Sequence, residues 1–444
     1  MFFFTQIDPR AAIKGSRDPL GFQPVWTGFG RRVVGNLTTV TTSVKNFATL
    51  LLGLYFADRV LSSHPFDEEQ RAALFLKFEQ LAAYCRYAYN KAEGDSAEGL
   101  LGIRRVQRRF HEDRGRLRIS ANREHQILSN QKTYGLWGLY SVAARQSGLL
   151  ERNENRLTQT ALDFVEAEYL PRLSYPGNKN GAEIERFVVK DSWFEPKHKD
   201  RKIGKALAEL LGPKLTRSER AFYAKTLVLG IEEGCDHTSG MQQQLWEIIS
   251  EINDSGNFSW HEDFDFHELT ECYKLAQARD YGQLAHALEA IHALEPVLAA
   301  SSRLFGFLLK RNENSLNDVV SEVQSKWGSS LRHIQSAKVE ALRYKIESAS
   351  SAKDSADRII RLAEALRVGD YLDAIQIAVD QNLEVMKARG GGPWLSIERN
   401  CFKVRLKEES GSLPEAEELP ALWVNSYFLN SLKTIGRKVM RTSA

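Results

Sequence analysis

The chain has 444 residues and a formal net charge of +3, with 43% hydrophobic and 26% charged residues, so it has room for two or three globular domains. Its 22 Phe, 14 Tyr and 8 Trp exclude a disordered polypeptide. The longest apolar run, Phe47–Ala57, is about half of the ~20 residues that a membrane-spanning helix needs, which argues against a membrane protein.

Helical periodicity dominates the chain from about residue 43 and predicts a mainly α fold. In the first 170 residues it predicts helices around Phe47–Ala57 and over Asp67–Lys91, Lys132–Ser147 and Thr158–Leu170. Thr158 is a suitable N-cap for the last of these helices, and Pro171 is its expected stop. A link rich in Pro, Gly and Asn then predicts a domain boundary near residues 173–181.

The segment Tyr134–Thr158 resembles part of a winged-helix domain. A helix over Tyr134–Gln146 is followed by Gly148-Leu149-Leu150, a polar turn at Glu151–Asn155, and the start of the next helix at Thr158. The resemblance implies a winged-helix-like N-terminal half. However, Tyr134–Tyr140 is apolar on nearly every face, which indicates a buried helix instead of one that lies in a DNA groove. Gly135 and Gly138 suggest that another helix approaches it closely. Whether this helix contacts bases is left open.

Positive charge gathers just before that segment. Between Leu101 and Lys132 there are nine Lys and Arg residues against three acids, a local excess of six in a chain of net charge +3. Such clusters bind phosphate backbones, cover solvated helix faces or pair with acidic proteins. The predicted nucleic-acid-binding residues are Arg104, Arg105, Arg108, Arg109, Arg114, Arg116, Arg118 and Arg123.

The remaining segments complete a four-part division of the chain. Residues 1–172 form an N-terminal helical domain, 182–255 a basic helical middle region, 256–389 a helical-hairpin domain and 390–444 a β-hairpin with a terminal helix. The basic face of the middle region is either a phosphate track or a solvated surface. Two Asp-Tyr corners, at Asp280-Tyr281 and Asp370-Tyr371, predict two αα-hairpins.

Within the last two parts, Lys326–Ser348 is expected to be one exposed connecting helix. Alternation of apolar and polar residues over Trp394–Glu398 and Cys401–Leu406 predicts a small hairpin that turns at Arg399-Asn400. A final helix is expected over Leu419–Val439.

Signals for catalysis, metal binding and cofactors are weak. One group of possible metal ligands lacks the usual spacing of zinc ligands: His261, Asp263, Asp265, His267 and Glu268, with Cys235-Asp236-His237. Asp263 or Asp265 is better placed to cap a helix that begins near His267. Gly390–Gly392 lacks the residues of a phosphate-binding loop. We therefore expect no metal, no cofactor and no catalytic residues. Four scattered cysteines and the lack of a basic segment before Phe2-Phe3-Phe4 favour a cytoplasmic protein.

Three segments resemble in texture the large helical bacterial proteins that are encoded beside ATPases, nucleases or helicases in anti-phage defence operons. They are Asp18–Gly21 with Gly30–Thr38, Tyr134–Leu150, and Gly390–Trp394. This resemblance implies a subunit of a DNA-linked, antiviral multi-protein complex. With the arginine cluster and the weak signals for catalysis, we expect a DNA-binding, non-enzymatic subunit that engages duplex DNA and protein partners. It assigns no functional residue. A helical scaffold or adaptor without a nucleic-acid role, and a divergent nuclease or nucleotide hydrolase, remain the alternatives.

Overall fold

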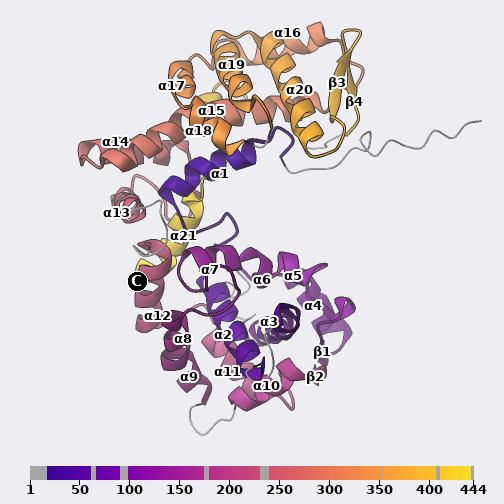
Figure 1. Ribbon diagram of the computed structural model, residues 1–444, viewed down its shortest axis with the longest axis vertical. Helices are drawn as coiled ribbons and strands as arrows, with labels where there is room; N and C mark the ends of the chain where they lie inside the picture. The colour runs from indigo at the N-terminus through magenta and orange to yellow at the C-terminus, as the bar shows by residue number, and fades with distance from the viewer. Residues whose placement is uncertain are drawn as a thin grey trace, which may run out of the picture. The chain divides into compact units, whose positions relative to one another are not determined.

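The computed structural model describes residues 18–61, 67–90, 99–174, 180–230, 240–350, 352–406 and 411–441. These residues form a mainly helical fold with two small antiparallel sheets, β1–β2 and β3–β4 (Figure 1). The predicted fold class, mainly α with a C-terminal β-hairpin, is confirmed. None of the helices described here is both long and apolar enough to cross a membrane.

The chain divides into two compact units, each built from separated segments. Unit 1 consists of residues 1–33 and 247–429, and unit 2 of residues 34–246 and 430–444. Both sides of the boundary expected near residues 173–181 therefore belong to unit 2, and residues 18–33 belong with the hairpin region. The division follows packing between distant segments, whereas the four-part prediction followed composition along the chain.

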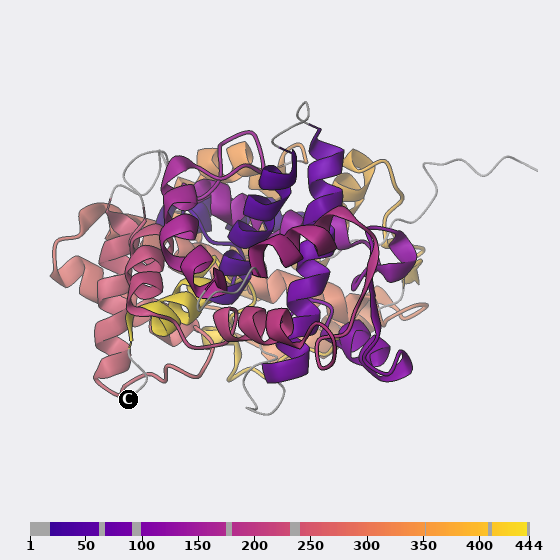
Figure 2. The same ribbon diagram turned by 90° about the horizontal axis from the view of Figure 1, so that it is seen from below.

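Two long helices form the centre of unit 2, and Figure 2 shows the indigo-to-magenta helices of this unit from below. Helices α2 (Val44–Leu61) and α3 (Glu68–Asn90) form where the periodicity predicted them, and they pack on each other. Around them lie α4 (Ile103–Glu112), β1 (Leu117–Ile119), η3 (Arg123–His125), α5 (Gln131–Tyr134), α6 (Leu136–Leu139), α7 (Ser141–Gln146), α8 (Gln159–Phe164), η4 (Val165–Tyr169), α9 (Leu170–Ser174), α10 (Asn180–Val189), β2 (Ser192–Phe194), α11 (Arg201–Leu210), α12 (Arg217–Tyr223) and η5 (Ala224–Val228). The chain passes between the units three times: after Val33, within α13 (Met241–Asp254) and at the start of α21 (Leu429–Met440).

A buried ion pair joins two elements of this core. The Lys45 ammonium on α2 lies 2.7 Å from the Glu219 carboxylate on α12 and also donates a hydrogen bond to the Leu210 carbonyl. Burial lowers the pKa of Lys45, and the Glu219 carboxylate opposes that shift. Glu219 is also the third residue of a capping box with Thr216, which fixes the start of α12.

The single helix predicted over Lys132–Ser147 is wrong. Three short helices, α5, α6 and α7, replace it. The break between α5 and α6 lies at Gly135, which has an extended backbone (φ −88°, ψ −170°). A Cβ at Gly135 would lie 2.4 Å from the Gln131 carbonyl oxygen and 2.7 Å from the Glu79 carboxylate, so the junction requires glycine. The burial predicted for Tyr134–Tyr140 is confirmed at Trp137, which is 6% exposed, and is wrong at Tyr134, which is 55% exposed.

The segment that resembles a winged helix contains a very short strand pair. A single antiparallel bridge joins Leu150 to Leu157, and Thr158 caps α8 through the backbone N–H of Ala161. The helix after this cap does not stop at Pro171, since η4 and α9 continue it to Ser174. A helix, a bridged pair and a second helix thus follow the expected order, and their identity as a winged helix stays a prediction.

Unit 1 contains the two predicted hairpins. Helix α14 (Phe266–Ala278) pairs with α15 (Gly282–Leu308), and α19 (Ser355–Val368) pairs with α20 (Tyr371–Ala388). The expected single helix over Lys326–Ser348 is wrong: the end of α16 (Leu316–Trp327) is followed by α17 (Ser336–Ala341) and α18 (Arg343–Ala349). Trp327 is 1% exposed and its ring lies 5.9 Å from that of Tyr371, so this region packs into the hairpin core.

The chain's early segment is held by α20 within unit 1. Asp18 accepts hydrogen bonds from the backbone N–H groups of Phe22 and Gln23 and so caps α1 (Phe22–Val33). Arg389 donates to the Asp18 carbonyl at 2.6 Å, and the buried Asn382 donates to the Pro19 carbonyl while accepting from the Trp394 N–H. Two of the segments on which the bacterial resemblance rested are therefore both hydrogen-bonded to Asn382.

The C-terminal hairpin forms as predicted. Strand β3 (Leu395–Glu398) pairs with β4 (Cys401–Val404), and Arg399 and Asn400 both adopt positive φ, as a two-residue hairpin turn requires. Beyond it, the single helix expected over Leu419–Val439 is wrong, because the chain forms η6 (Leu419–Ala421), an extended segment and then α21. That segment is fixed by the fully buried Glu295 on α15, which accepts hydrogen bonds from Val424, Asn425 and Tyr427.

Candidate nucleic-acid interface

The predicted arginines lie on α4, in the turn between α4 and β1, on β1 and on η3, all in unit 2 (Figure 1, right). Helix α4 begins at Gly102, whose φ of 72° and close approach to the Ile127 carbonyl exclude a side chain. It packs on α3 through Val106, which is fully buried, while the Tyr87 and Phe110 rings meet edge to face at 5.2 Å. Of the four arginines of α4, Arg104 and Arg108 are exposed, whereas Arg105 and Arg109 are half-buried.

Two arginines of α4 act as structural ties. Arg105 donates a hydrogen bond to the Gln126 carbonyl at 3.1 Å, and Arg109 donates to the carbonyls of Glu124 and His125. Arg109 also reaches the Tyr84 hydroxyl at 3.4 Å, and both residues are half-buried. They hold the loop around η3 against α4. Removal of such hydrogen bonds lowers the stability of the fold.

Five of the eight predicted residues are exposed to solvent. They are Arg104, Arg108, Arg114, Arg116 and Arg123. Only weak ion pairs oppose them, since Arg108 lies 3.8 Å from Glu112 and Arg116 lies 3.7 Å from Glu195, and such exposed pairs contribute little stability. These five residues, called here the exposed arginines, can reach an anionic ligand without disturbing the core.

A surface hollow of about 340 Å³ lies between α4 and the following loop. Its lining consists of Arg105, Arg108, Arg109, Arg123, Glu124 and Ser129. Guanidinium groups match phosphate oxygens in geometry and charge, so a hollow walled by four arginines suits a phosphate group. Because Arg105 and Arg109 are already hydrogen-bonded to backbone carbonyls, the wall of the hollow is preorganised.

The short ribbon beside α4 was not predicted. Strand β1 pairs with β2 so that Leu117 lies opposite Phe194 and Arg118 opposite Trp193. Leu117 and Phe194 are fully buried, whereas Trp193 is 40% exposed. Alternation along the strands therefore places Arg118 and Trp193 on the outer face of the ribbon.

Polar contacts with α3 fix the ribbon at both strands. Gln80 donates to the Ser120 carbonyl and accepts from the Ser120 N–H, at 2.8 and 3.1 Å. Lys77 forms an ion pair of 2.8 Å with Asp191, which also accepts from the Ser120 hydroxyl. The exposed side chains of the ribbon are thus carried by a rigid support.

The second basic face expected in the middle region continues past β2. Lys197, Lys199, Arg201, Lys202 and Lys205 are all exposed. Lys197 lies 5.6 Å from the centre of the Phe110 ring on α4, which connects this face to the arginines. Intervening acids pair with some of these cations, as Glu195 does with Lys199 at 3.4 Å.

The cluster of possible metal ligands is not brought together. Asp265 caps α14 through the Glu268 N–H at 2.8 Å, as predicted, and the buried Glu268 accepts a hydrogen bond from Asn253. Cys235–His237 lie outside the described residues. Within the described parts of the chain, no group of three or more His, Cys, Asp and Glu side chains is arranged to hold a metal ion.

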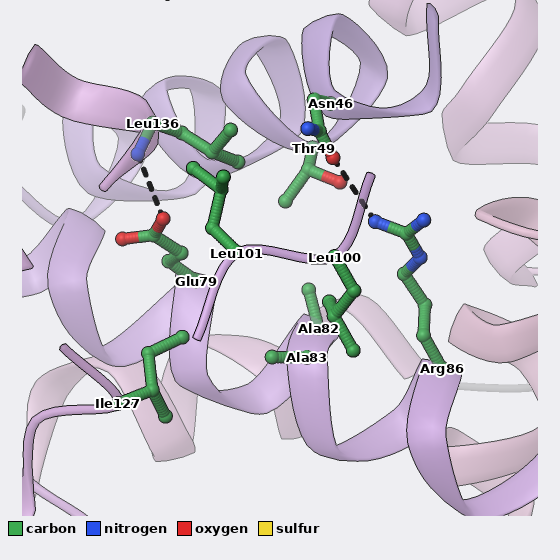
Figure 3. A pocket seen from close by; sticks show the side chains of 10 residues that line it. All are labelled: Asn46, Thr49, Glu79, Ala82, Ala83, Arg86, Leu100, Leu101, Ile127 and Leu136. Atoms are coloured by element: carbon green, nitrogen blue, oxygen red, sulfur yellow. Dashed lines mark hydrogen bonds between the residues drawn. The ribbon is translucent and has the colours of Figure 1, made fainter. Parts of the chain in front are cut away.

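A small cavity of about 10 Å³ inside unit 2 has room for one water molecule. Figure 3 shows Glu79 and Arg86, two turns apart on α3, on either side of Leu100 and Leu101. Glu79 accepts hydrogen bonds from the Leu136 N–H at 2.8 Å and from Gln131 at 2.7 Å, and Arg86 donates to Asn46 at 3.1 Å. A space of this size is too small for a substrate. We therefore assign Glu79 the role of fixing the junction at Gly135.

Burial raises the pKa of Glu79 to about 7, although both hydrogen bonds favour the charged form, and burial lowers the pKa of Arg86 to about 10. Because the pKa of Glu79 is higher in the folded chain than in the unfolded chain, the folded state binds more protons between about pH 4.5 and 7. We expect the free energy of unfolding to fall as the pH rises through this window, with Glu79 contributing a slope of at most about 1.4 kcal/mol per pH unit.

Urea denaturation at several pH values measures this slope. Glu79→Gln should flatten it, and the exposed Glu262→Gln should leave it unchanged. A Glu79→Gln protein with the wild-type slope would contradict the assignment of a raised pKa to this carboxyl group.

Comparisons with protein-family models, with curated proteins and with solved structures found no match to this chain.

Proposed function

We propose that this protein binds nucleic acid through the exposed arginines of unit 2. The observation that carries the proposal is the set of five exposed arginines on α4 and the segments that follow it. Two of them, Arg108 and Arg123, line a hollow of about 340 Å³ that suits a phosphate group. A phosphate backbone binds through many such contacts, each of which releases condensed counterions. The neighbouring exposed lysines from Lys197 to Lys205 extend the basic surface.

The rest of the proposal concerns the setting in which this surface acts. We propose a non-enzymatic cytoplasmic subunit of a bacterial multi-protein complex, of the DNA-linked, anti-phage kind that the sequence resembles. Unit 1 would then bind a protein partner, since it exposes apolar side chains on its helices, including Tyr344 at 84%, Val368 at 57% and Leu372 at 41%. The same side chains favour the alternative of a scaffold without a nucleic-acid role.

Salt dependence of duplex DNA binding tests the proposal. A labelled duplex titrated by fluorescence anisotropy should bind, with log K falling linearly against log salt. Contact by all five exposed arginines would give a slope of about −4 to −5, since each phosphate contact on duplex DNA contributes roughly −0.9. Absence of binding to both duplex and single-stranded nucleic acid at low salt would reject the proposal in favour of a scaffold, and degradation of the duplex with a divalent cation would favour the enzyme alternative.

A further inference from the structure

Trp193 is the only exposed tryptophan of the eight in the chain, all of which lie in the described residues. Its neighbour Phe194 is fully buried beneath the ribbon, so the hydrophobic core does not require an indole at position 193. A large aromatic ring that is 40% exposed keeps apolar surface in contact with water and contributes little to folding. Its position in the basic surface needs a different explanation.

Two arginines lie over this ring. The guanidinium carbon of Arg116 is 4.8 Å from the ring centre, and that of Arg118 is 5.5 Å away. These cation–π contacts restrict the indole, while Arg116 remains exposed and available to an anion. A planar hydrophobic surface and a positive charge are therefore presented side by side.

This combination is the one that unpaired nucleotides require. Bases of a single strand stack on aromatic rings while the adjoining phosphates bind cations. Bases of a duplex are stacked on one another and cannot cover the indole without unpairing. We infer that the surface formed by Trp193, Arg116 and the exposed arginines of α4 binds single-stranded nucleic acid, with an unpaired base stacked on Trp193.

The inference rests on the proposed function and refines its ligand from a phosphate backbone in general to an unpaired strand. The ribbon is fixed to α3 by Gln80 and Lys77 and buried through Leu117 and Phe194, so removal of the indole should leave the fold intact. Stacking on the ring should strengthen binding about 5- to 150-fold per base.

A cycle of two proteins and two strands isolates this stacking. Wild type and Trp193→Ala are titrated with a thymidine 15-mer and with a 15-mer that has the same phosphates but no bases. We expect Trp193→Ala to weaken binding of the thymidine strand by about 5- to 150-fold and to leave binding of the abasic strand unchanged. Trp193→Phe should retain most of the affinity, and its melting temperature and that of Trp193→Ala should match the wild type.

Fluorescence and two further ligands complete the test. Binding of the thymidine strand should quench tryptophan emission in wild type and not in Trp193→Phe. Tyr344→Ala, which removes the exposed aromatic of unit 1, is the matched control and should bind every ligand as wild type does. A uridine 15-mer distinguishes RNA from DNA, and a duplex measures the preference for unpaired strands.

The possible failures are separable. Equal losses on thymidine and abasic strands, or no loss on either, would overturn the stacking of a base on Trp193 while leaving phosphate binding in place. If wild type binds none of the strands and no duplex at low salt, the proposed function itself fails.

Discussion

Reversing the charge of the exposed arginines should abolish binding to duplex DNA while the protein stays folded. The variant combines Arg104→Glu, Arg108→Glu, Arg114→Glu, Arg116→Glu and Arg123→Glu. Each lost phosphate contact should flatten the salt slope by about 0.9, and the new carboxylates should repel the backbone in addition. Arg105 and Arg109 stay unchanged, since their guanidinium groups hold the carbonyls of residues 124–126. Anisotropy titrations at several salt concentrations, with a thermal melt, measure both effects.

A matched control separates this surface from net charge. Glutamate replaces five exposed cations of unit 1, namely Arg332, Lys353, Lys387, Lys403 and Arg405, which changes the net charge by the same amount. This control should bind duplex DNA with a slope close to that of wild type. Equal losses in the two variants would show that binding follows net charge, and an unchanged affinity in the first variant would reject the arginine surface.

Trp137→Ala should strongly destabilise unit 2. The Trp137 side chain is 6% exposed, and its ring centre lies 5.5 Å from that of Phe75 on α3. Truncation of a buried tryptophan typically costs about 3–5 kcal/mol through lost contacts and an unfilled cavity. For a unit of this size such a loss should lower the melting temperature by about 6–20 °C, and the yield of folded protein should fall with it.

Tyr134→Ala is the control for this prediction, because Tyr134 lies one turn away and is 55% exposed. Its melting temperature should stay close to that of wild type. If Trp137→Ala instead keeps normal stability and loses DNA binding, the short helix α6 is a recognition surface, as the winged-helix resemblance would allow.

The sequence predicted elements whose causes are local. The α2–α3 region, the two hairpins and the turn at Arg399-Asn400 all follow from periodicity or from turn residues within a few positions. The break at Gly135 was missed because its cause, the Glu79 carboxylate, comes from a distant part of the chain.

The candidate site divides in the same way. Clustering of arginines is visible in the sequence, whereas the distinction between the exposed arginines and the tying pair Arg105 and Arg109 depends on the carbonyls they reach. Trp193 was missed because strands of three residues show too little alternation to reveal their partners. The one local signal was the sequence Ser192-Trp193-Phe194, in which two neighbouring aromatics must point to opposite faces of a strand.

The interleaved make-up of the two units has a consequence for synthesis. Residues 18–33 leave the ribosome early, yet the α15 and α20 surfaces that bury them are translated only after most of unit 2. Unit 2 in turn lacks α21 until residues 429–440 have been made, and α21 contributes Ser431 and Lys438 as donors to the carbonyls of Thr38 and Thr42. Each unit therefore needs segments that lie far apart along the chain, and the nascent protein must keep apolar surfaces such as those of α1 from aggregating until their later partners have been translated.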